Sequence, residues 1–412
     1  MNDKQDIEIL RPLAERVREI AAMPVQDERR ELWRRIHSLD AARPMLFVDV
    51  SMPGWDCFGS EMRCADPFFR QHEYALRSAI FHHGLEDDCV VEPWITQTAS
   101  YVVPKEGHWG ISPTRIPSTA PGGAWKTLPS IKVPGDVRKM TVPWHEVDEK
   151  QTALDLQRIQ DAVGDILEVN LSRKPFMSVW GSHISGDLGE LRGIETVMYD
   201  MLDNPQWLHG LLASMRDGIL KIQQEAEDAG DWSLGDHENQ SVPYCTELPD
   251  PKPNSGPVKR KDLWCLMAAQ EMTLISPQMH DEFMLRYQIP IMEHWGLVHY
   301  GCCEDLSEKI DILRQVRNLR SIAVTPWANV PRAAEQIRTD YVASWRPSPA
   351  DTVCCGFQPQ RVRSILRNGV RAFREHGCPL EINLKDVKTV EGDGGRLRRF
   401  ARIAREVIDE FY

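Results

Sequence analysis

The sequence predicts an α/β protein, a TIM (β/α)8 barrel with an N-terminal helical extension. Short apolar runs recur along the chain, helical patterns separate most of them, and 412 residues suffice for eight strand–helix units with extensions. An open doubly wound sheet is the alternative. That fold is disfavoured because no G-x-G-x-x-G turn follows an early strand.

Residues 1–42 are predicted to form the helical extension, and residues 43–412 the barrel. Apolar residues recur at helical spacing from Ile7 to Ile20 and again from Leu32 to Leu39. Eight apolar runs then follow, of the kind that a parallel strand covered on both faces requires. They are residues 44–51, 89–95, 176–182, 232–236, 297–302, 321–327, 341–345 and 379–386.

Helix signals are clearest late in the chain. Ser276 is a candidate N-cap with Pro277 at the first helical position, and an apolar stripe from Leu397 to Phe411 predicts a C-terminal helix. Residues 101–135 and 236–261 are irregular and rich in Pro, Gly and Ser. Long irregular segments inside a domain are usually active-site lids or binding loops.

Composition excludes several classes of protein. The formal net charge of −12 argues against a general nucleic-acid binder, which needs a basic surface. No apolar run approaches the roughly 18 residues that a membrane span requires. The N-terminal residues are acidic and lack the apolar core of a secretory signal, so the expected compartment is the cytoplasm.

In a barrel, reactive groups lie where strands end and the following loops begin. His299, Cys302 and Cys303 follow this rule in "LVHYGCCEDL" and are predicted metal ligands, since zinc takes imidazole and thiolate. Side chains alternate along a strand, so His299 and Cys302 point to opposite faces unless the strand ends before Cys302. Two alternatives stay open: a core histidine with two buried thiols, and a redox pair.

Catalytic and binding candidates follow other predicted strands. His237 and Glu238 are candidates for proton transfer, and a loop histidine held by hydrogen bonds is the alternative. Lys385 is a third catalytic candidate, with a structural salt bridge to Asp386 as its alternative. The predicted substrate-binding residues are mostly aromatic and are expected to line a pocket for an apolar or aromatic ligand: Trp55, Glu92, Trp94, Trp180, Tyr244, Trp327 and Arg346.

Several motifs between residues 44 and 410 resemble the uroporphyrinogen decarboxylase superfamily, in particular its corrinoid-dependent methyltransferase-like branch. They are "DPFFRQHEYALRSAIFHHG", "VVEPWI", "YGCCEDL", "SIAVTPWANV" and "LKDVKTV". The resemblance implies a barrel with its active site in the carboxyl-terminal mouth. In the methyltransferases an H-x-C motif and a later cysteine hold zinc. Here His299 matches, Gly301 stands at the expected cysteine, and only Cys378 precedes the late strand.

The resemblance implies an enzyme that passes a methyl group between a small methylated substrate and a corrinoid, either free or carried by a partner protein, with zinc assistance. The first alternative is a decarboxylase acting on a small acid or tetrapyrrole. In such decarboxylases an arginine-rich loop grips the substrate, and the corresponding segment here has only Arg63. The second alternative is a non-catalytic corrinoid- or ligand-binding protein.

Overall fold

The computed structural model describes residues 3–40, 42–51, 54–120, 123–178 and 180–412. Its strands are β1 (Met45–Val48), β2 (Trp94–Thr98), β3 (Thr114–Ile116), β4 (Lys126–Leu128), β5 (Glu168–Ser172), β6 (Trp264–Met267), β7 (Leu297–Tyr300), β8 (Leu319–Val324), β9 (Val342–Trp345) and β10 (Leu380–Leu384). Its helices are α1 (Asp3–Ala21), α2 (Pro24–His37), α3 (Gly54–Phe58), α4 (Pro67–Leu85), α5 (Glu149–Val163), α6 (Ser185–Arg192), α7 (Ile194–Asp203), α8 (Pro205–Ala229), α9 (Pro277–His280), α10 (Arg286–Met292), α11 (Ile310–Leu313), α12 (Val330–Ile337), α13 (Pro359–Glu375) and α14 (Gly395–Phe411).

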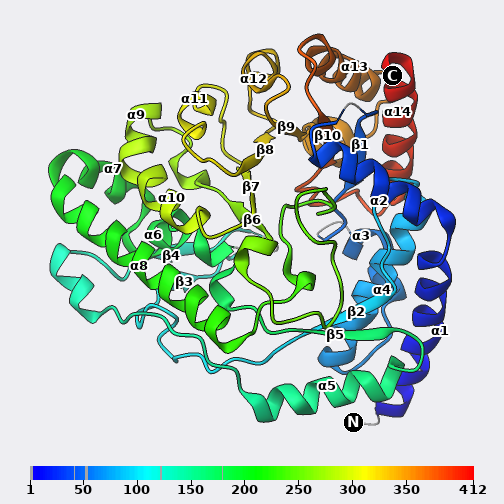
Figure 1. Cartoon of the computed structure of the whole chain (residues 1–412), viewed down its shortest axis with the longest axis horizontal. Helices are drawn as coiled ribbons and strands as arrows, with labels where there is room; N and C mark the ends of the chain where they lie inside the picture. Colours follow the sequence, from blue (N-terminus) through cyan, green and yellow to red (C-terminus); the bar gives the residue numbers. More distant parts are fainter. Residues whose placement is uncertain (1–2, 41, 52–53, 121–122, 179) are drawn as a thin grey trace.

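Six strands form one parallel sheet at the centre of the molecule, in the order β1-β10-β9-β8-β7-β6 (Figure 1). One face carries apolar side chains of the main core, among them Tyr300, Ile322, Trp345 and Ile382. The register pairs His299 with Ser321 and Ser344 with Glu381 on the other face, and all four are buried. The sheet therefore has an apolar outer face and a buried polar inner face.

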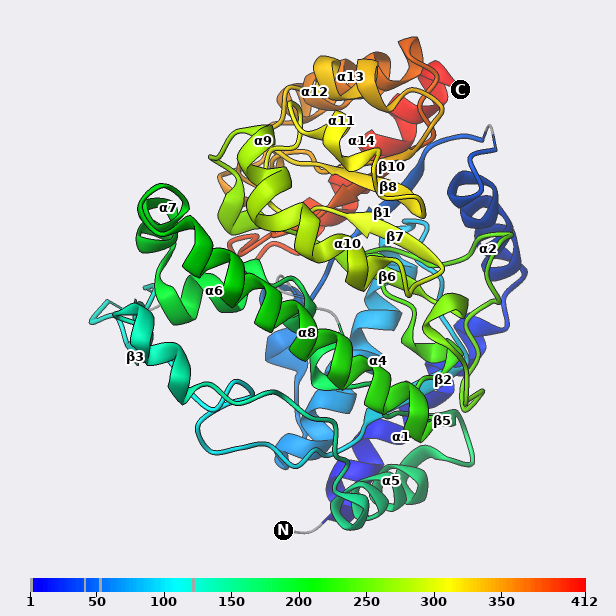
Figure 2. The ribbon, with the colours of Figure 1, turned by 60° about the vertical axis from the view of Figure 1, so that its left-hand side comes forward.

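Helices cover the outer face of this sheet. Figure 1 shows α9, α11, α12, α13 and α14 outside the strands, and α14 contacts β1 while α12 contacts β8 and β9. Figure 2 shows the long helix α8 below α10, against which it packs. At the N-terminus α1 packs against α4 and α2 against β1. This arrangement is a barrel-like α/β fold.

A closed ring of eight hydrogen-bonded strands is not formed by the described residues. The strands β2 and β5 pair only with each other. At the β1 edge, the backbone N–H of Leu46 donates to the Asp88 carboxylate (2.7 Å), and the Asp88 N–H donates to the Leu46 carbonyl (2.7 Å). At the β6 edge, the Trp264 N–H donates to His237 Nδ1 (3.2 Å). Side chains and irregular backbone thus take the place of neighbouring strands.

Two predicted strands are wrong. In the predicted strand 176–182, the described residues form the 3₁₀ turns η3 (Phe176–Ser178) and η4 (Trp180–Ser182), and residues 234–236 form the 3₁₀ turn η5 (Leu234–Asp236). In η5 the Ser233 hydroxyl accepts from the Gly235 N–H, and the Asp236 carboxylate accepts from the Ser233 N–H. Such local hydrogen bonds compete with strand pairing. Strands β5 and β6 were not predicted from the sequence, and β2 begins at Trp94, five residues after the start of the predicted run at residue 89.

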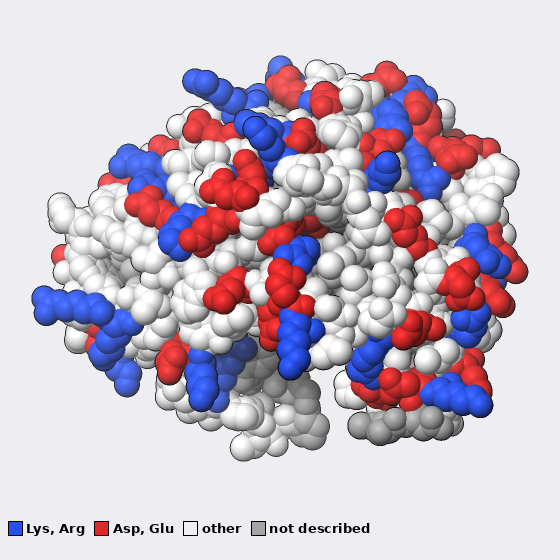
Figure 3. All heavy atoms as spheres, turned by 60° about the horizontal axis from the view of Figure 1, so that its bottom comes forward, with Lys and Arg blue, Asp and Glu red and all other residues white. Residues whose placement is uncertain are grey.

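Other sequence predictions agree with the structure. Four predicted runs contain β1, β7, β9 and β10, and the run 321–327 overlaps β8 but begins two residues late. Ser276 caps α9 by accepting from the Met279 N–H. In the irregular segment 101–135, the short hairpin β3–β4 supplies the only strands among the described residues. Acidic and basic side chains are interspersed on the face in Figure 3. No helix within the described ranges is long and apolar enough to cross a membrane.

Candidate functional site

The carboxyl end of β7 carries two adjacent thiols. Gly301 turns the chain there with a φ of 108°, in the left-handed region that side chains rarely adopt. The Sγ atoms of Cys302 and Cys303 lie 3.5 Å apart, and the Cys303 thiol donates to the Asp386 carboxylate just after β10 (3.7 Å). Cys302 is buried and Cys303 is exposed. Only the second thiol therefore faces solvent directly.

Glu304 fixes the backbone around these thiols. One carboxylate oxygen accepts from the Cys302 N–H (2.8 Å), and the other accepts from the Ala269 N–H after β6 (2.7 Å). Glu304 is fully buried. Burial lowers the pKa of the nearby Lys309 amine to about 8, although Glu304 acts in the opposite direction. Glu304 thus ties together the loops that leave β6 and β7.

Arg346, directly after β9, places a buried positive charge beneath the thiols. Its Nη1 donates to the Cys302 carbonyl and its Nη2 to Gln240 Oε1 (2.7 Å), and Nη2 also lies 3.2 Å from His299 Nε2. None of these partners is a carboxylate. Arg346 Nε has no hydrogen-bond partner in the described part of the chain. This guanidinium can therefore stabilise an anion that forms beside it.

The electrostatics of the thiol pair favour one thiolate. When the single Cys303 hydrogen is donated to Cys302 Sγ instead of Asp386, this hydrogen bond lowers the pKa of the Cys302 thiol to about 7, and the charges of Arg346 and Lys385 act in the same direction against burial. The same hydrogen bond raises the pKa of Cys303. Because the thiolate is the nucleophilic form of cysteine, these pKa shifts make Cys302, rather than Cys303, the candidate nucleophile.

The rim of the site is cationic and aromatic. Lys385 Nζ lies 5.4 Å from the centre of the Trp180 ring on η4, a cation–π contact. Trp180 and Trp327 are 52% and 78% exposed, so both rings are free to meet a ligand. Trp327 follows β8 at the same carboxyl end of the sheet.

The predicted zinc ligands do not come together as a metal site. No group of three or more His, Cys, Asp or Glu side chains across the described residues is arranged to hold a metal ion. Both His299 ring nitrogens are engaged, Nδ1 with Ser321 (3.0 Å) and Nε2 with the Gly301 carbonyl (3.2 Å) and Arg346. The Arg346 guanidinium repels a metal cation from this position, so the residues present do not fit zinc.

Several other predicted site residues lie near the amino ends of strands. His237 accepts a hydrogen bond from the first residue of β6, burial lowers its pKa to about 4, and Glu238 follows it. Glu92 lies just before β2, where it accepts from the Tyr244 hydroxyl (2.5 Å) and pairs with Arg30 (2.8 Å). Trp94 is the first residue of β2. The side chain of Trp55, on α3, lies outside the described residues.

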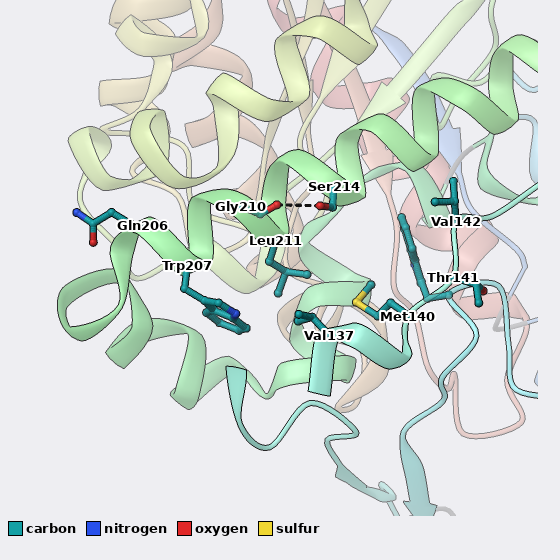
Figure 4. Close-up of a pocket in the computed structure, with 10 residues that line it drawn as sticks. Val137, Met140, Thr141, Val142, Gln206, Trp207, Gly210, Leu211 and Ser214 are labelled. Atoms are coloured by element: carbon teal, nitrogen blue, oxygen red, sulfur yellow. Dashed lines mark hydrogen bonds between the residues drawn. The ribbon is translucent and has the colours of Figure 1, made fainter. Parts of the chain in front are cut away.

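Two cavities adjoin the Trp109 ring. One, of about 430 Å³, lies between α8 and residues 137–142 and is mostly apolar; Figure 4 shows Trp207 and Leu211 from α8 facing Val137 and Met140. The other, of about 410 Å³, is lined by His108, Trp109, Phe176, Asp187 and Glu190 among others. The predicted lid or binding loop at residues 101–135 includes His108 and Trp109. Phe176, Asp187 and Glu190 were not predicted as site residues. Asp187 and Glu190 lie on a helix and carried no motif.

Comparisons with known proteins do not assign the chain to a family. No family model matches it, and no curated protein matches it. A methyltransferase from Methanosarcina mazei is among the solved structures with similarity to the chain, at 10% sequence identity and a TM-score of 0.45. The match covers 93% of this chain and 98% of the methyltransferase.

Proposed function

We propose that this chain is a methyltransferase that uses Cys302 as its nucleophile and exchanges a methyl group between a small methylated substrate and a corrinoid co-substrate. The observation that carries the proposal is the thiol pair at the carboxyl end of β7, with Arg346 beneath it and Lys385 at its rim. The sequence resemblance to corrinoid-dependent methyltransferases motivates the choice of reaction.

The proposed reaction has two displacement steps. In the first, a lone pair on Cys302 sulfur forms a bond to the methyl carbon, and the bond from methyl to its leaving atom breaks with both electrons on that atom. In the second, the methyl group passes to a nucleophilic corrinoid, and the S–C electron pair returns to sulfur. Arg346 stabilises the thiolate before and after, and Lys385 can stabilise the negative charge that develops on the leaving atom when the methyl group is carried on oxygen or sulfur.

Methylcobalamin tests the second step in reverse. Incubation without oxygen should move a methyl group to Cys302, seen as loss of methylcobalamin absorbance and as the mass of one added methylene on the Cys302 peptide. Cys302→Ser should slow this transfer at least about a hundredfold, because an alcohol at neutral pH is a far weaker nucleophile than a thiolate.

The matched control is Cys355→Ser, which removes an exposed thiol in another loop. It should transfer the methyl group as the unaltered protein does. Equal transfer by Cys302→Ser, or methylation of a different cysteine, would contradict the assignment.

The chain is not expected to decarboxylate uroporphyrinogen. A substrate with many carboxylates needs a concentrated cationic grip to offset their desolvation. Arg63 is exposed, and it is the one arginine in the segment that corresponds to the decarboxylase loop. Assaying the purified protein with uroporphyrinogen should yield no coproporphyrinogen, while efficient conversion would replace the methyltransferase proposal with the lyase alternative.

A further inference from the structure

The cavity of about 410 Å³ is built from three separate parts of the chain: residues 107–115, Phe176 after β5, and residues 187–191 of α6. Its volume falls within the range of small-molecule sites. Phe176 in the cavity wall stands four residues before Trp180, whose ring contacts Lys385 at the rim of the thiol site.

One wall of this cavity is aromatic. The rings of His108 and Phe176 stack with centroids 3.8 Å apart and an angle of 14° between their planes. Burial lowers the pKa of His108, so at neutral pH its ring is uncharged. Trp109, 5% exposed, adds a third ring. Stacked neutral rings present electron-rich faces, which attract cations.

The polar side of the cavity has excess negative charge. Arg115 pairs with Glu190 (2.7 Å), so these two charges balance. Asp187 accepts a hydrogen bond from the Trp109 indole N–H (2.6 Å), and within the described part of the chain no cationic side chain pairs with it. Burial raises the pKa of Asp187 to about 6 despite this hydrogen bond, and Glu190 and Glu271 raise it further. At neutral pH Asp187 is therefore mostly an ionised carboxylate that lacks a cation.

We propose that this cavity binds a methylated ammonium group, with Asp187 as its counter-ion and the His108–Phe176 pair as its aromatic wall. A methylated ammonium has a diffuse charge and an apolar surface, so it suits a site with aromatic rings and one carboxylate better than a compact, strongly hydrated cation does. That such a compound is also the methyl donor rests on the proposed function; binding itself does not.

Choline and its uncharged isostere 3,3-dimethyl-1-butanol test the site, because they share shape and differ in charge. Isothermal titration calorimetry of the full chain at neutral pH should show saturable binding of choline. Binding of the alcohol should be at least about tenfold weaker. Asp187→Asn should weaken choline binding at least about tenfold. The asparagine oxygen can still accept from Trp109, so the fold should be kept, which circular dichroism can verify.

Two further variants sharpen the test. Phe176→Leu keeps an apolar side chain but removes the ring, and it should weaken choline binding several-fold. Asp311→Asn removes the same charge from a side chain that is 79% exposed on α11, and should bind choline normally. Absence of saturable choline binding, equal binding of the alcohol, or normal binding by Asp187→Asn would overturn the proposal. None of these outcomes depends on Cys302, so the methylcobalamin experiment stands or fails separately.

Discussion

Replacing Glu304 with alanine is expected to lower the free energy of unfolding by about 3–5 kcal/mol, as loss of one partner of a buried, hydrogen-bonded charge typically does. The variant leaves the buried N–H groups of Cys302 and Ala269 without their acceptor. Each buried donor without a partner costs about 1–3 kcal/mol. Lys309, buried nearby, also loses a neighbouring carboxylate.

Urea denaturation followed by tryptophan fluorescence measures this effect. Glu308→Ala is the matched control, since its side chain is 69% exposed in the same loop, and should change stability by no more than about 0.5 kcal/mol. Glu304→Gln should lie between the two, because the amide retains one acceptor. If Glu304→Ala unfolded at the same urea concentration as Glu308→Ala, the hydrogen bonds from Glu304 to the loops after β6 and β7 would not contribute to stability.

Gly301→Cys, which restores the H-x-C motif, is expected to destabilise the protein by about 2–5 kcal/mol and not to create a zinc site. The residue has a φ of 108°, which costs a side chain about 1–3 kcal/mol. An added Cβ would also lie 2.8 Å from Ala323 Cβ and 2.8 Å from Leu306 Cδ1, and overpacking of this kind typically costs about 1–3 kcal/mol more.

Thermal unfolding and zinc content of the purified variant test this prediction. Gly210→Ala is the control, because its Cβ meets no atom within 4 Å on α8, and the better helix propensity of alanine should raise stability by up to about 1 kcal/mol. A Gly301→Cys protein that was as stable as the unaltered chain and carried stoichiometric zinc would show that this turn accepts a side chain.

Strands β7, β9 and β10 were predicted from groups of apolar residues, although each of these strands also carries at least one buried polar residue. They lie inside mostly apolar runs, because both faces of the sheet are covered there. By contrast, β5 mixes Glu168 and Asn170 with apolar residues and pairs on one side only, and β6 is only four residues long. Periodicity is weak in such short or mixed strands.

For the candidate site, local sequence placed the thiols but not their surroundings. Cys302 and Cys303 could be predicted at a strand end because they directly follow the apolar residues of β7 in the sequence. The neighbours that set their chemistry are distant in sequence: Arg346 contacts Cys302 across 44 residues, and Asp386 contacts Cys303 across 83. The hydrogen bond between Trp109 and Asp187 spans 78 residues. Contacts of this range depend on how the strands assemble, which periodicity does not encode.

The capped edges of the central sheet have a consequence for aggregation. An exposed strand edge offers free N–H and C=O groups to which a strand from another molecule can pair, and this is a common route to amyloid-like assembly. Here Asp88 occupies backbone groups of β1, and His237 occupies an N–H of β6. Intermolecular strand addition would first have to break these hydrogen bonds. Asp88 and His237 thus oppose strand addition at these two edges, a role that neither residue type reveals in the sequence.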